Sequence, residues 1–383
     1  MNRAGRYTVN LSGEAEYRSF CPSPLPPSPP IDLEADTQAL LMEVSKKLAV
    51  LDGLSSRIPD IKLFVSMYVR KEALVSSQIE GTQCTLEDVL DPNIEKNANL
   101  DVADVVNYIA AFNYAEERLK ELPLCNRLIK EVHAVLMQGV RGGEKTPGEF
   151  RTSQNWIGGA GSSIKTARYI PPNPDDMEEA MSALEKYINS DDSLDPIVRA
   201  ALIHYQFETI HPFLDGNGRV GRLLIVLFLI EQKIISSPVL YLSCFLKMNR
   251  VEYYDRMTTV RKTGNYEQWI AFFVEIAAQA AEDALETIDA LLQLHSKNLE
   301  KIRQSPARTA ANLERLFVYA EKNPILDIGR TASALEMSYN TAAKYIGILC
   351  SYGILKIGEK QGKTQLFYYG DYLDILKKNT ELI

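Results

Sequence analysis

The segment from His211 to Arg222, HPFLDGNGRVGR, constrains the fold more than any other part of the chain. Before it, residues 197–210 are apolar at helical spacing, and Pro212 ends that pattern. After it, residues 223–230 form an uninterrupted apolar run, which predicts a helix buried on nearly all sides. We therefore expect a short polar loop between two helices, with His211 at the end of the first.

This loop carries residue types that suit phosphate groups. Gly216 and Gly218 can adopt conformations in which successive backbone N–H groups form a concave anion site, and the next helix adds its positive end. Arg219 and Arg222 are three apart on the first turn of that helix, so both can donate to phosphate oxygens. Asp215 offers a hard carboxylate, which suits magnesium bridging phosphates better than zinc.

His211 completes the chemistry of the loop, because an imidazole with a pKa near neutrality can accept the proton of an attacking hydroxyl. Together these residues predict transfer of a phosphate-containing group. Residues 216–221 also match the G-x-G-x-x-G pattern of dinucleotide-binding folds. That pattern requires a preceding strand and an acidic residue about twenty positions later. Here we expect a preceding helix, and residues 236–238 are Ser-Ser-Pro, so we reject this interpretation.

The segment resembles the Fic-family motif, H-P-F-x-[DE]-G-N-G-R-x-x-R, with every specified position filled. The resemblance implies an all-helical core that moves AMP from ATP, with Mg²⁺, onto a Tyr, Thr or Ser hydroxyl of a target protein. It implies that His211 is the general base, that Asp215 ligates Mg²⁺, and that the following residues bind ATP: Gly216, Asn217 and Gly218 at the α and β phosphates, Arg219 and Arg222 at the β and γ end, with Val220 and Gly221 between them. The alternative, a polar loop with a capping His and two solvated arginines, leaves this convergence of roles unexplained.

A second segment, from Ser76 to Gly81, places Ser76 and Glu80 on one helical face with Gly81 at the position of a C-cap. Taken alone, a Glu before a capping Gly is commonly solvated. The segment resembles the Fic-family inhibitory motif, [ST]-x-x-x-E-[GN], in the arrangement where the inhibitory helix precedes the core. The resemblance implies that Glu80 pairs with Arg222, takes the place of the γ phosphate and inhibits transfer. In some relatives the same Glu supports removal of AMP.

Residues 148–172 have glycines, β-branched residues and no helical period, which predicts a β-hairpin; a surface loop is the alternative. In Fic proteins the matching segment is the flap, which implies that Ile164, Lys165 and Thr166 dock the target backbone beside the base. The resemblance also implies that Asn249 binds the adenosine of ATP. Tyr253 and Tyr254 fall in the same region, where core packing is the alternative.

The 383 residues allow two or three domains. We expect an N-terminal arm and helices with the inhibitory helix (1–100), a Fic catalytic core (101–285), a linker helix (286–307) and a C-terminal domain (308–383). Residues 1–31 are expected to be loop-like, and the proline-rich stretch 22–30 is an arm that is either disordered or packed along the core. His133 is interpreted as a packing residue rather than a ligand. Helices are expected at 32–51, 60–79, 103–121, 126–137, 238–250, 251–260 and 269–294.

The C-terminal region predicts a helix at 312–323, a helix-turn-helix at 331–352, and a two-stranded wing at 354–369. It resembles the winged helix that many bacterial Fic proteins carry. The second helix of the pair has only Lys344 as a basic residue; the wing adds Lys356, Lys360 and Lys363, but the charges of the region nearly balance. DNA binding therefore stays open, and dimerisation or target docking is at least as well supported.

A net charge of −8 and a pI near 5.3 argue against a general binder of nucleic acids or membrane surfaces. The 5 cysteines are scattered without a CxxC pair and are expected to be reduced structural thiols. Neither a signal peptide nor a membrane span is recognisable, so the expected location is the cytoplasm, with a homodimer left open. The sequence thus predicts a self-inhibited protein adenylyltransferase; the alternatives are removal of AMP and a nucleotide-sensing DNA-binding regulator.

Overall fold

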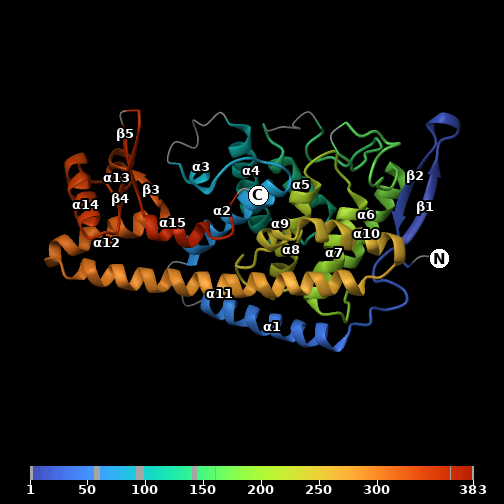
Figure 1. Ribbon diagram of the computed structural model, residues 1–383, viewed down its shortest axis with the longest axis horizontal. Coiled ribbons are helices and arrows are strands. Elements are labelled where there is room, and N and C mark those ends of the chain that lie inside the picture. The colour runs from blue at the N-terminus through green and yellow to red at the C-terminus, as the bar shows by residue number, and fades with distance from the viewer. Residues whose placement is uncertain are drawn as a thin grey trace.

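The computed structural model describes residues 3–55, 61–91, 99–139, 145–159, 161–362 and 364–381. The chain is mainly helical and elongated, and α11 (Glu267–Arg303) runs along almost its whole length (Figure 1). The other helices are α1 (Ala35–Ser55), α2 (Ile61–Ile79), α3 (Leu86–Leu90), α4 (Leu100–Arg118), α5 (Asn126–Leu136), α6 (Pro174–Ile188), α7 (Pro196–Ile210), α8 (Asn217–Glu231), α9 (Ser243–Met248), α10 (Arg250–Thr263), α12 (Ala307–Lys322), α13 (Ile328–Ala334), α14 (Tyr339–Ser351) and α15 (Gly370–Lys377). The strands are β1 (Gly5–Asn10), β2 (Tyr17–Pro22), β3 (Ile325–Asp327), β4 (Lys356–Gln361) and β5 (Thr364–Tyr368).

Helices α7 and α8 form the centre of the molecule, as the apolar runs on either side of the His211 loop predict. Asp195 caps the start of α7 by accepting from the backbone N–H of Ile197, and Pro196 occupies the first turn. All residues from Ile197 to Ile210 are buried, and α8 is buried along most of its length. Helices that are apolar on every face must be enclosed, so their neighbours hold the connecting loop in a fixed place.

Helix α2 is anchored to α11 by a buried polar cluster. Asp283 of α11 accepts from Tyr68 Oη at 3.3 Å and lies 3.4 Å from Lys71 Nζ, and Lys71 is only 3% exposed. Beyond α15, Asn379 also donates to Asp283 at 3.2 Å. Because a buried charge must be paired, these contacts fix α2 along the long helix.

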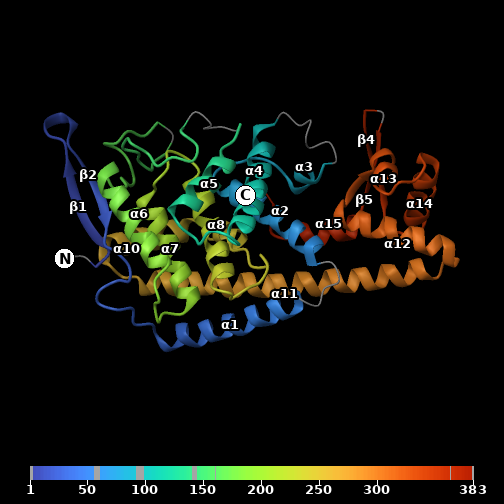
Figure 2. The same ribbon diagram turned by 180° about the vertical axis from the view of Figure 1, so that it is seen from behind.

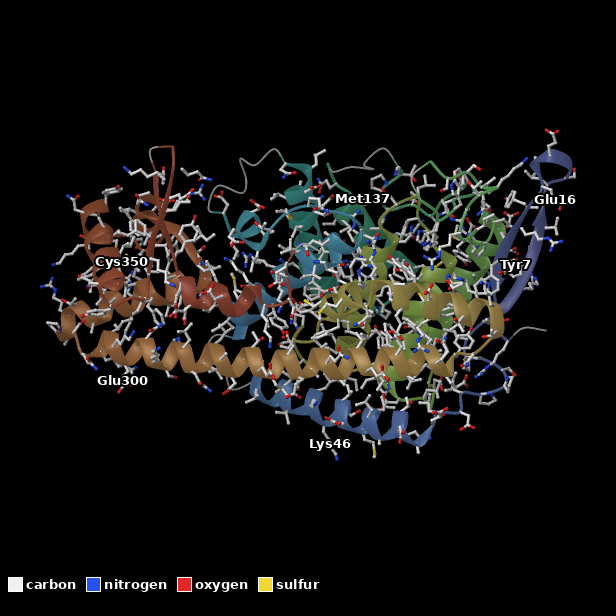
Figure 3. The ribbon with its side chains drawn as sticks, viewed as in Figure 1. Tyr7, Glu16, Lys46, Met137, Glu300 and Cys350 are labelled. Carbon is white, nitrogen blue, oxygen red and sulfur yellow. The ribbon has the colours of Figure 1, made fainter. Side chains whose placement is uncertain are left out.

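The N-terminal residues differ from the prediction. Residues 1–31 were expected to be loop-like, and this is wrong for β1 and β2, which pair antiparallel with Tyr7 opposite Phe20. The two rings pack edge to face, and the hairpin projects from one end of the molecule, where Tyr7 and Glu16 are labelled (Figure 3). The proline-rich arm that follows packs on the core, since Gln206 donates to the carbonyl oxygen of Ser23 at 2.9 Å. Of the two alternatives for this arm, the structure has the packed one.

The C-terminal unit lies at the opposite end of the molecule and contains α12 to α14 and a small antiparallel sheet of order β3-β5-β4 (Figure 1). Strand β3, with three residues, was not expected. Lys363 of the wing lies outside the described residues, and the identification as a winged helix stays a prediction. The expected linker helix is not a separate element, because α11 continues through residue 303 without interruption. Helix α15 then returns toward α2 near the middle of the molecule (Figure 2).

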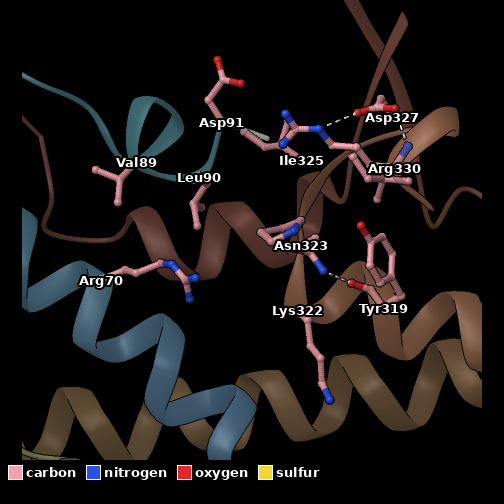
Figure 4. Close-up of a pocket in the computed structure, with 12 residues that line it drawn as sticks. Arg70, Val89, Leu90, Asp91, Tyr319, Lys322, Asn323, Ile325, Asp327 and Arg330 are labelled. Carbon is pink, nitrogen blue, oxygen red and sulfur yellow. Dashed lines mark hydrogen bonds and ion pairs between the residues drawn. The ribbon is translucent and has the colours of Figure 1, made fainter. Parts of the chain in front are cut away.

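A cavity of about 210 Å³ lies where the C-terminal unit meets α2 and α3. Arg70 of α2 and Arg330 of α13 face this space from opposite sides, with Asn323 between them (Figure 4). Arg330 lies 3.7 Å from Asp327. This junction is therefore polar and incompletely filled, in contrast to the apolar packing around α7 and α8.

None of the helices in the described segments is long and apolar enough to span a membrane. The cysteines are free, and only Cys350 is not fully buried. This agrees with their interpretation as structural thiols.

The cluster on Asp283 predicts a large loss of stability in Asp283→Ala. The substitution leaves Lys71 charged and buried without its partner, so we expect the free energy of unfolding to fall by about 3 kcal/mol. The matched control is Asp289→Ala on the same helix, because Asp289 is exposed and bonded only to Gln293 within the described residues. Urea unfolding followed by circular dichroism would measure both. Equal losses in the two variants would contradict the proposed anchoring.

Candidate active site

The loop from His211 to Gly216 turns sharply between α7 and α8. His211 is the C-cap of α7 in the left-handed region, with φ 51°, and Gly216 precedes α8 with φ 74°. Asn217 ties the loop together: its Oδ1 accepts from Phe213 N at 2.8 Å, and its Nδ2 donates to Phe213 O at 2.9 Å. The Asn217 side chain thus holds the loop, and only its main chain remains for the predicted contact with phosphate.

Arg151, to which the sequence assigned no role, supports the loop from below. Its side chain is almost fully buried and donates to the carbonyl oxygens of His211 at 3.0 Å, Ser153 at 3.1 Å and Pro172 at 2.5 Å. Its backbone N–H donates to Pro212 O at 2.9 Å. Burial lowers the pKa of Arg151 to about 10, which still leaves it charged at neutral pH. The Arg151 guanidinium therefore ties the left-handed backbone of His211 to the flap segment.

His133 supports the same loop from the other side. Its ring stacks on Phe213 with centroids 3.7 Å apart. Nδ1 accepts from Gly148 N at 2.9 Å, so Nε2 carries the hydrogen and donates to Asp215 O at 3.1 Å. Burial lowers the pKa of His133 to about 4, which fits this neutral form. His133 is the packing residue that the sequence predicted, and it packs on the motif itself.

A cavity of about 600 Å³ opens above the loop, a size typical of small-molecule sites. It brings together residues far apart in the chain: Glu80 after α2, His211 and Asp215 from the loop, and Gly218 and Arg222 from α8. The rest of its wall comes from α7, the flap segment and α10, with these residues: Trp156, Ile157, Gly158, Gly159, Arg168, Tyr169, Glu208, Arg250, Tyr253, Tyr254, Met257, Thr258 and Arg261.

His211 is arranged in this cavity as a neutral base. Its Nδ1 lies 3.3 Å from the carbonyl oxygen of Glu208, so Nδ1 carries the hydrogen and Nε2 keeps its lone pair. Burial lowers the pKa of His211 to about 4, opposed by the Glu208 carbonyl and the charges of Glu80 and Asp215. At neutral pH the imidazole is therefore uncharged and can accept a proton.

Arg222 is enclosed by the segment from Ser76 to Gly81. Its Nη2 lies 2.7 Å from Glu80 Oε1, its Nε donates to Ser76 Oγ at 2.8 Å, and its Nη2 also donates to Ser76 O at 2.9 Å. The Arg222 side chain is 2% exposed and that of Glu80 39%. Burial alone would lower the pKa of Arg222. The charge of Glu80 and the nearby tyrosines together raise the pKa by more than burial lowers it, so the net shift is upward.

The Glu80 carboxylate lies directly over the start of α8. A Cβ added at Gly218 would stand 2.1 Å from Glu80 Oε1 and 3.0 Å from Arg222 Nη1. Glycine is required here because a side chain would fill the space that the carboxylate occupies. The positive end of a helix favours an anion at this position, and the carboxylate supplies one. Gly81, which follows with φ 102°, turns the chain away from the site.

Other predicted residues lie outside the cavity. Arg219 lies 3.2 Å from Asp104 and 3.5 Å from the sulfur of Met137, and it does not line the cavity. Asn249 donates to Phe245 O at 2.9 Å and does not line the cavity. Val220 is buried in the core, and Gly221 packs against Glu208. The roles of these residues stay predictions.

The flap segment is less regular than the predicted hairpin. A single antiparallel pair, Ile157 with Tyr169, closes it through two backbone hydrogen bonds of 2.8 and 3.0 Å. Between them, Ile164, Lys165 and Thr166 form a turn in which Ser163 N donates to Thr166 Oγ1 at 2.9 Å. Ala160 lies outside the described residues. These three residues do not line the cavity, and their predicted contact with a target stays a prediction.

Asp215 could coordinate a magnesium ion only together with phosphate oxygens of a bound nucleotide. Its Oδ1 accepts from Gly216 N at 2.7 Å, and its Oδ2 lies 2.9 Å from Lys145 Nζ. Burial raises the pKa of Asp215, but these hydrogen bonds outweigh it and the pKa is lowered. Among the described residues there is no group of three His, Cys, Asp or Glu side chains that could hold a metal. Magnesium commonly binds through one carboxylate with substrate phosphates and water, which this arrangement allows.

The bonds of Arg151 predict that Arg151→Met destabilises the protein. The variant keeps the length of the side chain but leaves several buried carbonyl oxygens without a donor, so we expect the free energy of unfolding to fall by about 3 kcal/mol. Arg168→Met, in the same segment but paired with Asp255 at the surface, should cost less than about 1 kcal/mol. Chemical denaturation would compare the two, and a similar cost for both would contradict the role assigned to Arg151.

Comparison with known proteins agrees with this geometry. The model of the Fic/DOC family N-terminal region matches residues 38–117, and that of the Fic/DOC family matches residues 123–229. Curated relatives named protein adenylyltransferase Fic, from Drosophila melanogaster and Drosophila sechellia, are 30% identical over 183 residues. These alignments cover 45% of this chain and 34% of the relatives, so the match spans about a third of their length.

Solved structures share the fold. A Fic family protein from Desulfovibrio desulfuricans superposes with a TM-score of 0.58 at 19% identity, covering 90% of this chain and 98% of that one. Fic-1 from C. elegans superposes with a TM-score of 0.51 at 19% identity, covering 67% and 73%. The two matched regions contain both the segment from Ser76 to Gly81 and the loop from His211 to Arg222. Over residues 38–117 and 123–229 the chain is therefore similar to the Fic/DOC family, and it shares the fold of these structures.

Proposed function

We propose that this chain transfers AMP from ATP to a hydroxyl side chain of a target protein and that Glu80 restrains the reaction. The observation that carries the proposal is the position of the Glu80 carboxylate, 2.7 Å from Arg222 and over Gly218, in the same cavity as His211. An anion site and a neutral base in one cavity are the two parts that nucleotidyl transfer needs. The name of the curated relatives supports the same activity.

In the proposed reaction the phosphates of ATP lie over Gly216 and Gly218 at the start of α8. The hydroxyl of the target gives its proton to Nε2 of His211, and its oxygen bonds to the α phosphorus. The bond from the α phosphorus to the bridging oxygen breaks, and pyrophosphate leaves with the electron pair. Asp215 would hold Mg²⁺, which neutralises charge on the phosphates. Positioning and electrostatic stabilisation supply most of the catalysis in such transfers.

The proposed inhibition follows from charge and space. The Glu80 carboxylate and a γ phosphate are both anions that Arg222 would bind, and they cannot share one site. ATP therefore binds either with its γ phosphate displaced or after Glu80 has moved. Removing Glu80 from Arg222 leaves a buried guanidinium, which the γ phosphate can then neutralise. The pair thus acts as a switch between two occupants of one site.

The flap would receive the target. Its turn at residues 163–166 is held by its own hydrogen bonds, and the pair Ile157 and Tyr169 fixes the base of the segment beside the cavity. Main-chain pairing of a target strand would bring a hydroxyl to His211 with little dependence on side chains. Surfaces outside the cavity would therefore determine which target protein is selected.

The inhibition predicts that Glu80→Gly increases transfer of label from α-labelled ATP, to lysate proteins or to the protein itself, by on the order of 10- to 100-fold. Gln83→Gly adds a glycine three residues after Glu80, at a residue without a hydrogen bond to Arg222, and should behave as the wild type. Glu80→Gly combined with His211→Ala should transfer no label, because the base is lost. If Glu80→Gly binds ATP but transfers nothing, the proposal fails, and removal of AMP by the wild type becomes the reaction to assay.

The magnesium assignment predicts opposite effects at two neighbouring residues. In the Glu80→Gly background, Asp215→Asn should raise the half-saturating Mg²⁺ concentration about tenfold, because the ligand loses its charge. Lys145→Ala should lower it, because this substitution removes the cation bound to the same carboxylate. Titration of transfer activity with Mg²⁺ would measure both. An unchanged requirement in Asp215→Asn would remove Asp215 as the ligand.

A further inference from the structure

Glu208, one turn before His211 on α7, places a buried carboxylate in the candidate active site. It lines the cavity, and its side chain is 9% exposed. Its Oε2 lies 4.0 Å from His211 Nδ1, and its own carbonyl oxygen lies 3.3 Å from the same nitrogen. Neither the motif nor the inhibitory segment includes this residue, and the proposed reaction has so far given it no part.

The other carboxylate oxygen has no hydrogen-bond partner in the described part of the chain. This atom, Oε1, is buried and packs on the backbone of α8, where a Cβ added at Gly221 would stand 2.2 Å from it. Glycine inside a helix is less favourable than Ala. A glycine at 221 and an incompletely bonded buried carboxylate are both unfavourable for stability, so the arrangement calls for a functional explanation.

Charged and titratable groups surround Glu208 on every side. They come from α7, α8, α10 and the end of α2: His211, Arg222, Arg261, Tyr253, Tyr254 and Glu80. Burial raises the pKa of Glu208 to about 7, against the opposing charges of Arg222 and Arg261, and Glu80 raises it further. The carboxylate is therefore partly ionised at neutral pH, and its charge changes within the working range of an enzyme.

We propose that Glu208 is a positioning residue for His211, an inference that rests on the proposed transfer reaction. The Glu208 carbonyl oxygen holds the hydrogen on Nδ1, which leaves Nε2 as the base, and the Glu208 carboxylate lies 4.0 Å from the same nitrogen. When Nε2 takes the proton of the target hydroxyl, the imidazolium acquires a counter-charge at Nδ1 inside a cavity that excludes much of the water. Glu208 acts through His211. Gly221 makes room for it.

The test compares Glu208→Gln with its parent in the Glu80→Gly background. Gln keeps the shape of the protonated acid, so the fold is preserved, and kcat should fall about tenfold with KM for ATP unchanged. The ionised carboxylate is the active form, so kcat of the parent should rise as the pH passes upward through the pKa of Glu208. Glu208→Gln should lack this rise, and Glu208→Asp should retain it. Glu252→Gln, which removes an exposed carboxylate from α10, is the control.

A second measurement does not depend on activity. In ¹⁵N-histidine NMR spectra, assigned with His211→Ala, Glu208→Gln should lower the pKa of His211, while the Nδ1–H form stays because the main-chain carbonyl of residue 208 remains. An unchanged pH profile together with an unchanged His211 signal would overturn the role of Glu208. If the Glu80→Gly parent transfers no AMP, the proposed function fails, while the NMR comparison still decides whether Glu208 governs His211.

Discussion

The ion pair between Glu80 and Arg222 is the interaction on which the site depends. The guanidinium lies almost completely buried on α8, and burying a charge without a partner is costly. Its partners, Glu80 and Ser76, both come from the segment that ends α2, so the position of α2 and the charge balance of the cavity are coupled. Asp283 of α11 in turn anchors α2 through Tyr68 and Lys71. An anionic ligand that pairs with Arg222 would neutralise the guanidinium in place of Glu80, and the Glu80 carboxylate could then leave the site.

The rest of the site is held by groups that never face the cavity. Arg151 fixes the main chain of His211, His133 stacks below Phe213, and Asn217 closes the loop on itself. These contacts place two uncommon backbone conformations, at His211 and Gly216, on a rigid pair of buried helices. These contacts, made by residues outside the cavity, fix the base and the anion site relative to each other before a substrate binds. Glu208 extends the same principle to the orientation of the imidazole.

Patterns that are local in the sequence predicted the local structure. Helical periodicity and proline positions predicted α7 and α8, and the glycines of the loop predicted a turn at the start of a helix. Contacts between distant segments were not predictable in this way. The partner of Arg219, Asp104, lies 115 positions away, and nothing in either neighbourhood connects the two. The bonds of Arg151 go to carbonyl oxygens, which every residue has, so no residue type marks them. Strands β1 and β2 are short, and their pairing depends on Phe20 meeting Tyr7 rather than on a clear alternation.

The central claim is that the Glu80 carboxylate and the γ phosphate of ATP compete for Arg222. Isothermal titration calorimetry of ATP and ADP, with the wild type and Glu80→Gly, tests it most directly. The claim predicts that Glu80→Gly binds ATP more tightly than the wild type does, while the affinity for ADP, which lacks the γ phosphate, changes little. Equal gains for ATP and ADP, or no gain for either, would show that the carboxylate does not occupy the place of the γ phosphate.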